Sequence, residues 1–326
     1  MPKLVPLSLD AFVVAAAFID DVPALALGDG TVRLLDGAEP KVLAVHAGSV
    51  LAAELTRDGR GLITGGDDGK LKRVAADGSV TDLAERGRKW LDQIATGPDG
   101  ALAFASGRTL WVRFADGRIE ETQFPRAVGG IAFAPKGLRL AIARYDGVTL
   151  IFPGTTAKPS ELTWKGMHSL VSFSPDGRFV VTAMQEPALH GWRLPDARDM
   201  RMSGYPTKVR SMSWTAKGRY LATSGAPASV MWPFTSKDGP MGKQPLELGF
   251  AQDAMVARVA AHPDEDVVAL GYSTGEVRLV RVPDGAEVPV RPADGAPISA
   301  LAWDANGERL LIGTEKGAAG LFDLRA

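Results

Sequence analysis

The stretch FSPDGRFVV, at residues 173–181, has a pattern that returns along the chain. An apolar or aromatic residue is followed by a short polar turn with Gly, and then by a second apolar segment. The same order occurs in ELTRDGRGLITG at 54–65, AFAPKGLRLAIA at 132–143, SWTAKGRYLAT at 213–223 and AWDANGERLLIG at 302–313. Gly accepts the positive φ that tight hairpin turns require. Each stretch therefore predicts two antiparallel strands joined by a turn.

These turns recur with a period near 40 residues. An eighth turn, marked by Asp21, is acidic and lacks the Gly, as does the acidic turn marked by Asp264. A fixed internal period of this length indicates a repeat architecture, and eight units of about 41 residues account for the whole chain. The other seven turns are marked by Asp58, Asp99, Lys136, Asp176, Lys217, Asp264 and Asn306.

Each unit also contains a third strand and a more polar fourth strand. GDGTVRLL at 28–35 and STGEVRLVRV at 273–282 have the third-strand pattern, while KVLAVHA at 41–47 and VTDLAER at 80–86 have the fourth-strand pattern. No stretch shows sustained helical periodicity. Four antiparallel strands at this period are typical of one blade of a β-propeller.

Three segments resemble the WD-repeat (WD40) β-propeller family: FSPDGRFVV, GGDDGK at 65–70 and GDGTVRLLD at 28–36. The resemblance implies an all-β, closed propeller of four-stranded antiparallel blades, forming a single domain over residues 1–326. It also implies a hydrogen-bonded network of a loop His, a strand Thr and a turn Asp, carried over to His46, Thr64 and Asp68. Val74 stands where the family has Trp, so this network is incomplete and the repeats are degenerate.

The number of strand units along the chain predicts eight blades, with seven as the alternative. Eight three-strand units are present, but the last one ends on its third strand, at 318–324. An orphan strand opens the chain at Lys3–Leu9. Pairing the orphan strand with the last third strand completes the final blade and leaves no open edge, which is how all-β proteins avoid edge-to-edge aggregation.

The composition excludes several classes of site. The 326 residues include 37 basic and 38 acidic side chains, a balance that argues against nucleic-acid binding. There is no cysteine, which excludes disulfides, thiolate metal sites and Cys nucleophiles. The longest N-terminal apolar run, 12–19, is too short for a membrane helix. We expect a cytoplasmic protein with no membrane association, and the Ala-, Gly- and Arg-rich composition suggests a bacterial source.

No catalytic or metal-binding motif is present. HExxH, GxSxG and the phosphate-binding Gly-rich loops are all missing. The four histidines fall at different positions in the repeat, so a structural role is predicted for each, and no metal or cofactor is expected. The histidines are His46, His168, His190 and His262.

Basic and aromatic residues gather in the loops that a propeller places on one rim. These loops join the fourth strand of one blade to the first strand of the next, and the second strand to the third. Arg, Trp and Tyr are the residue types that dominate binding hot spots. The predicted partner-binding residues are Arg88, Lys89, Trp90, Arg126, Arg144, Tyr145, Lys165, Lys208 and Arg210.

Two main functions remain open. The first is a non-enzymatic protein–protein interaction scaffold that presents this rim to a partner, which could have an acidic surface. The alternative is a propeller enzyme, or a binder of a small ligand or metal, that uses the central channel. Fold alone does not decide between them.

Overall fold

A computed structural model describes residues 3–37 and 39–325 of the chain. Thirty strands, β1 to β30, and one 3-10 turn, η1 (Pro98–Gly100), make up its regular structure. Within the described residues no helix is long and apolar enough to cross a membrane. The strands form seven antiparallel sheets, and the chain divides into two compact units.

Unit 1 contains residues 1–50, 76–79 and 210–326 and carries four four-stranded sheets. In three of them the strands follow one another in chain order. Their strands are β2 (Val13–Ile19), β3 (Val22–Leu27), β4 (Thr31–Leu34) and β5 (Lys41–Ala44); β20 (Met212–Trp214), β21 (Tyr220–Thr223), β22 (Ser229–Pro233) and β23 (Leu246–Leu248); and β24 (Val256–Ala261), β25 (Val267–Tyr272), β26 (Val277–Arg281) and β27 (Glu287–Arg291).

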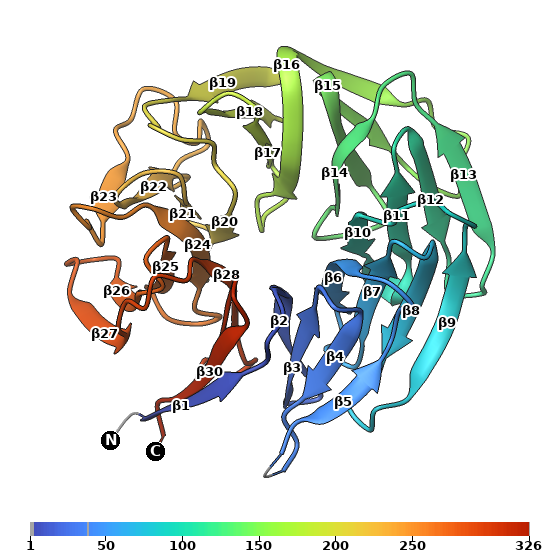
Figure 1. Cartoon of the computed structure of the whole chain (residues 1–326). Coiled ribbons are helices and arrows are strands. Elements are labelled where there is room, and N and C mark those ends of the chain that lie inside the picture. Colours follow the sequence, from blue (N-terminus) through green and yellow to red (C-terminus); the bar gives the residue numbers. More distant parts are fainter. Residues whose placement is uncertain (1–2, 38, 326) are drawn as a thin grey trace. The chain divides into compact units, whose positions relative to one another are not determined.

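The fourth sheet of unit 1 joins the beginning of the chain to its end. Its strand order is β1 (Lys3–Ser8), β30 (Ala318–Asp323), β29 (Arg309–Thr314) and β28 (Ile298–Trp303). β1 lies beside β30 (Figure 1) and is antiparallel to it, and Lys3 pairs with Asp323. The Ser299 hydroxyl also donates a 2.7 Å hydrogen bond to the Val13 carbonyl on β2. The predicted pairing of the N-terminal strand with the last third strand is thus confirmed.

Unit 2 contains residues 51–75 and 80–209. Two of its sheets have four strands, and the third has six. The four-stranded sheets are β6 (Val50–Leu55), β7 (Leu62–Gly66), β8 (Lys70–Val74) and β9 (Val80–Glu85); and β10 (Gln93–Thr96), β11 (Leu102–Ser106), β12 (Thr109–Arg113) and β13 (Ile119–Gln123). The six-stranded sheet is β14 (Val128–Phe133), β15 (Leu140–Ile151), β16 (Ser160–Phe173), β17 (Phe179–Met184), β18 (Leu189–Arg193) and β19 (Arg198–Met202).

The six-stranded sheet corrects the predicted blade count. β15, 12 residues long, contains the second and third predicted strands of one repeat, and β16, 14 residues long, continues from the fourth strand of that repeat into the first strand of the next (Figure 1). The pair Tyr145–Met167 keeps them joined, while Gly147 at φ 135° and Gly166 at φ 118° let the backbone bend without leaving the sheet. Counted as hydrogen-bonded sheets, the blades number seven. The prediction of eight separate four-stranded blades is therefore wrong, and the alternative of seven matches the sheets.

The quoted stretch 173–181 shows why the turns form where the sequence places them. The Asp176 carboxylate accepts hydrogen bonds from the Ser174 hydroxyl (2.6 Å) and from the backbone N–H of Arg178 (3.0 Å). Gly177 follows at φ 72°, a conformation that favours glycine. The Ser174 hydroxyl in turn accepts the N–H of Phe179, the first residue of the next strand. These hydrogen bonds lie within the turn itself and require no contact between sheets.

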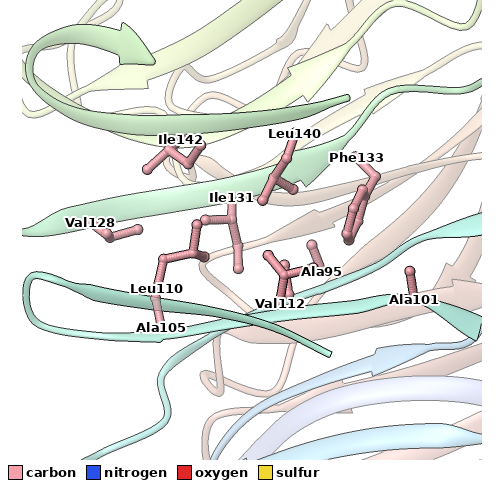
Figure 2. Close-up of a cluster of buried hydrophobic side chains, with 11 residues drawn as sticks. Ala95, Ala101, Ala105, Leu110, Val112, Val128, Ile131, Phe133, Leu140 and Ile142 are labelled. Atoms are coloured by element: carbon pink, nitrogen blue, oxygen red, sulfur yellow. The ribbon is translucent and has the colours of Figure 1, made fainter. Parts of the chain in front are cut away.

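Apolar side chains fill the spaces between neighbouring sheets within each unit. β7 and β17 are buried at every position, as expected for middle strands covered on both faces. One cluster joins the β10–β13 sheet to β14 and β15, and includes Leu110, Ile131 and Phe133 (Figure 2). Close packing of this kind is what holds the sheets against one another.

Candidate functional site

The loops of interest in unit 2 lie at one end of the sheets. Loops that join a fourth strand to the next first strand are hydrogen-bonded to the loops that join second and third strands. The donor–acceptor pairs are Arg86 N–Gly69 O (2.8 Å), Val128 N–Gly107 O (2.7 Å) and Gln185 N–Met167 O (2.9 Å). The two kinds of loop therefore lie together at this end of the sheets of unit 2, and these loops are called the rim.

Gly69 shows how closely these loops approach. It has φ 76°, and a Cβ built on it would lie 1.8 Å from the carbonyl oxygen of Gly87. Any side chain at this position would push the 87–89 loop away from the β7–β8 turn. The glycine thus positions the first cluster of predicted rim residues.

That first cluster contains Arg88, Lys89 and Trp90. The Trp90 side chain is 65% exposed, the highest value among the large apolar residues. Lys89 Nζ lies 4.9 Å from the centre of the buried Trp111 ring, a cation–π contact that fixes the lysine stem. Arg88 is exposed.

A second basic–aromatic pair lies on the next two loops. Arg126 Cζ lies 5.9 Å from the centre of the Tyr145 ring, and Tyr145 is 42% exposed. Lys165 is also exposed. Among the described residues, no ion pair joins Arg88, Lys89, Arg126 or Lys165 to a carboxylate. These four charges are therefore available to a partner.

The structure gives three other predicted rim residues local partners. Arg144 is half-buried, bonds the Thr149 hydroxyl at 2.7 Å and forms an ion pair with Glu161. Lys208 donates to Gln185 Oε1 at 2.8 Å. Arg210 belongs to unit 1, where its backbone N–H donates to Ser224 Oγ at 3.1 Å and its side chain is exposed.

The residues of the predicted WD-type network lie in different units. His46 is a buried residue of unit 1, whereas Thr64 and Asp68 belong to unit 2. Thr64 is fully buried on β7. Asp68 accepts the N–H of Lys70 at 3.1 Å and so caps its own turn, and Val74 is buried at the position of the family's Trp.

His168 and His190, both in unit 2, belong to one buried aromatic cluster, although their positions in the repeat predicted a separate structural role for each. His168 and His190 are both fully buried, with ring centres 6.2 Å apart. His168 bonds the Thr182 hydroxyl (2.8 Å) and the Trp164 carbonyl (3.0 Å). Desolvation lowers the pKa of His190 to about 4, although the nearby Asp199 opposes this shift. The cluster is therefore uncharged at neutral pH.

The remaining histidine, His262 in unit 1, stabilises a turn. Its Nδ1 accepts the backbone N–H groups of Asp264 (3.1 Å) and Glu265 (2.9 Å), and its Nε2 contacts the carbonyl of Gly307 at 2.9 Å. No group of three or more His, Asp or Glu side chains within the described residues is placed to hold a metal ion.

Comparisons with known proteins point to one fold. Residues 262–326 match the family described as the anaphase-promoting complex subunit 4 WD40 domain. The telomerase protein component 1 of Rattus norvegicus is 24% identical over 200 residues, and that of Mus musculus is 22% identical over 200 residues. Each match covers 60% of this chain but only 7% of the rodent protein, so the chain corresponds to a small part of these relatives.

Solved structures match along almost the whole chain. The computationally designed Ika8 protein has a TM-score of 0.80 at 15% identity, with 97% of each chain covered. The C-terminal WD40 domain of Sif2 has a TM-score of 0.80 at 14% identity, covering 99% of this chain and 98% of that one. These matches show the fold, and the resemblance to WD40 β-propellers read from the sequence is confirmed.

Proposed function

We propose that this WD40-type propeller is a non-enzymatic scaffold whose unit 2 rim holds an acidic surface of a partner protein. The observation that carries the proposal is that exposed aromatics and cations without an ion pair occur on the same loops of unit 2. Trp90 and Tyr145 are 65% and 42% exposed, and Lys89 and Arg126 each lie against an aromatic ring. Such side chains supply large contact areas together with charge, the combination found at binding hot spots.

The rim is also held in place before any partner arrives. Backbone hydrogen bonds of 2.7 to 2.9 Å tie each loop to the neighbouring turn. A pre-organised surface loses less conformational entropy on binding than a mobile one. The chain as a whole is balanced, with 37 basic and 38 acidic residues, which favours a protein surface over a polyanion as the partner.

We place this activity in the cytoplasm, because a chain without cysteine needs no oxidising compartment. The relatives named above do not identify the partner, because this chain matches only 7% of their length. The partner is defined here by its chemistry alone: a folded protein that presents carboxylates next to an apolar patch.

Affinity capture with three baits tests the proposal. The first bait is the wild-type chain, and the second carries Arg88→Glu, Trp90→Ala and Arg126→Glu on the rim. The third bait carries Lys136→Glu and Arg198→Glu, which change exposed cations away from the rim. Quantitative mass spectrometry should find proteins that the first and third baits retain and the second loses. Equal recovery by all three baits would eliminate the rim as the binding surface.

A direct measurement completes the test. The identified partner, purified, should bind the wild-type chain at least about tenfold more tightly than the rim variant, because each hot-spot residue contributes more than about 1 kcal/mol. The affinity should fall as salt is raised, since exposed charges are screened. The thermal midpoint of the rim variant should equal that of the wild type, which separates binding from folding.

A further inference from the structure

A cleft in unit 2 carries chemistry that the rim does not explain. It has a volume of about 540 Å³, which is within the range of small-ligand pockets. It lies between the β6–β9 and β10–β13 sheets, where the β6–β7 and β10–β11 turns are found. The rim loops leave from the opposite ends of β7 and β11, so the cleft and the rim are separate sites.

Two cross-strand pairs form the facing walls. On β7 and β8, Ile63 pairs with Arg73, and on β11 and β12, Leu102 pairs with Arg113. Directly paired residues of an antiparallel ladder point to the same face of their sheet. All four residues line the cleft, with Ile63 and Leu102 almost completely buried. Each wall therefore presents an apolar base and a guanidinium.

The repeat itself shows that Arg113 is unusual. Arg193 and Arg281 occupy the same place, the last residue of a third strand, paired with the first residue of the second strand. Each binds the Asp three residues later in a two-point contact, with Nε–Oδ1 distances of 2.9 Å to Asp196 and Asp284. Such fork-shaped pairs satisfy the guanidinium locally.

Arg113 also has an Asp three residues later, Asp116, but the two form no ion pair among the described residues. Asp116 instead accepts the N–H of Arg118 at 2.9 Å and lies 4.0 Å from Nε of the same residue. Within the described residues, Arg113 has one hydrogen bond, a long 3.4 Å contact with the carbonyl of Phe114, and no ion pair with a carboxylate. Its guanidinium faces the cleft, which Asp58 and Asp99 also line.

Arg73 is held in the cleft by a backbone carbonyl, and the Asp58 carboxylate is a charged neighbour without a direct contact to it. Its Nη2 donates to the Arg60 carbonyl at 2.6 Å. A Cβ at position 61 would lie only 2.5 Å from Nε of Arg73, so Gly61 leaves room for the arginine. No ion pair within 4.0 Å joins Arg73 to a carboxylate in the described part of the chain.

The other charged residues of the cleft limit the charge of a ligand. Arg57 is already bonded to the carbonyls of Thr96 and Ala134. Asp58 is held by the Thr56 hydroxyl, which lowers the pKa of its carboxyl group, and Asp99 lies at the exposed η1 turn. Three arginines against two aspartates leave one positive charge in excess. A single negative charge neutralises this excess, whereas a dianion would leave the occupied cleft with a net negative charge.

We infer that this cleft binds a monocarboxylate attached to an apolar body, with Arg73 and Arg113 holding the carboxylate and Ile63 and Leu102 packing against the body. A planar guanidinium is suited to a carboxylate, because its N–H groups match the two oxygens. The carboxylate can belong to a small organic acid or to an acidic residue of an extended peptide, and the two sources share this chemistry.

Titration with four probes tests the inference. Phenylacetate represents the small acid, and acetyl-Leu-Glu-Leu-amide represents the peptide. 2-Phenylethanol is the neutral counterpart of phenylacetate, and inorganic phosphate tests for a dianion. Binding is followed by methyl NMR of the wild-type protein, in which the Ile63 and Leu102 signals should shift while those of Ile312, in unit 1, should not.

Substitutions then assign the charge recognition. Arg73→Gln combined with Arg113→Gln should weaken binding of the acid or peptide at least tenfold, while Arg193→Gln, from the matching repeat position, should leave it unchanged. If the double variant does not fold, Arg73→Lys and Arg113→Lys keep the charge but lose the fork, and should weaken binding less.

The outcomes separate clearly. Saturable, arginine-dependent binding of phenylacetate assigns the cleft to a small acid, and binding of the peptide alone assigns it to a protein segment. The inference is overturned if neither binds, if 2-phenylethanol binds as well as phenylacetate, if phosphate binds more tightly than either acid, or if the wild-type methyl shifts lie elsewhere.

Discussion

The imidazole of His190 lies face to face with the indole of Trp164, with ring centres 4.0 Å apart and planes inclined by 18°. Nε2 of His190 is 3.4 Å from an Asp199 oxygen, and neither ring nitrogen has a hydrogen bond of good geometry within the described residues. Burial lowers the pKa of His190 to about 4. A fully buried ring without firm polar partners tolerates the neutral form far better than the charged one.

This burial predicts a loss of stability in mild acid. As the pH falls below about 6.5, the unfolded chain takes up a proton on His190, while the folded chain does not until about pH 4. The folded state should therefore lose about 1.4 kcal/mol per pH unit over this window, about 3 kcal/mol in all. Urea unfolding between pH 7 and pH 4.5 measures this slope.

The matched variant for this prediction is His190→Phe, which keeps an aromatic ring against Trp164 but cannot be protonated. The free energy of unfolding of this variant should depend less steeply on pH, by the slope that one bound proton produces. The contributions of His168 and the carboxylates remain in both proteins. Equal slopes for the two proteins would show that His190 does not titrate as described.

A second prediction concerns the glycine that positions the rim. Gly69 and Gly59 have nearly equal φ values, 76° and 73°, but only Gly69 has a backbone oxygen in the path of a Cβ. Gly59→Ala should lower the free energy of unfolding by only about 1 kcal/mol, the penalty for a side chain at positive φ. Gly69→Ala should cost about 3 kcal/mol or more, because the 87–89 loop has to move.

Urea unfolding of both alanine variants gives the comparison, since the conformational term cancels between them. Partner capture by Gly69→Ala, measured at a temperature where it is folded, should also fall. Similar stabilities of the two variants would mean that the loop is not packed against the β7–β8 turn.

A third prediction concerns the strand that joins the beginning of the chain to its end. Along β1, Leu4 packs against the cluster of Ile298, Leu310 and Phe322, whereas Val5 is 46% exposed. Leu4→Ser should cost about 1–2 kcal/mol, because it removes half-buried apolar surface. Val5→Ser should stay within about 0.5 kcal/mol of the wild type.

Thermal midpoints of the two serine variants check this prediction, and the lower one should belong to Leu4→Ser by a few degrees. A second, local measurement is the protection of the β30 amides from hydrogen exchange, which Leu4→Ser should reduce. Equal midpoints and equal protection would show that β1 adds nothing to the last sheet.

Local patterns predicted much of the fold because their causes lie within a few residues. The Ser174–Asp176–Gly177 turn needs only its own side chains and one positive φ. The pairing of β1 with β30 followed from counting strands, since each four-stranded sheet needs an outer strand. The rim loops were also located from the strand order alone.

The state of individual rim residues could not be predicted in the same way. Arg144 was expected to face a partner, but strand pairing places Glu161 beside it and neutralises its charge. Arg126 lies 19 residues before Tyr145 in the sequence, and only the folded loops bring its guanidinium over the ring. Such contacts depend on the register of neighbouring strands, which short sequence patterns do not specify.

By itself, the sequence determined the repeat, the turns, the strand type and the joining of the two chain ends. These follow from short-range turn chemistry and from the need of every sheet to bury its apolar faces. Only the tertiary structure decided that two repeats share one six-stranded sheet. It also decided that Arg193 binds the Asp three residues later, Asp196, whereas Asp116 binds Arg118 and not Arg113. The reason is that the local alternatives have similar energies. A bent strand can be paired or unpaired at the bend, and a guanidinium can bind either of two nearby acceptors. Contacts between distant segments then settle the outcome.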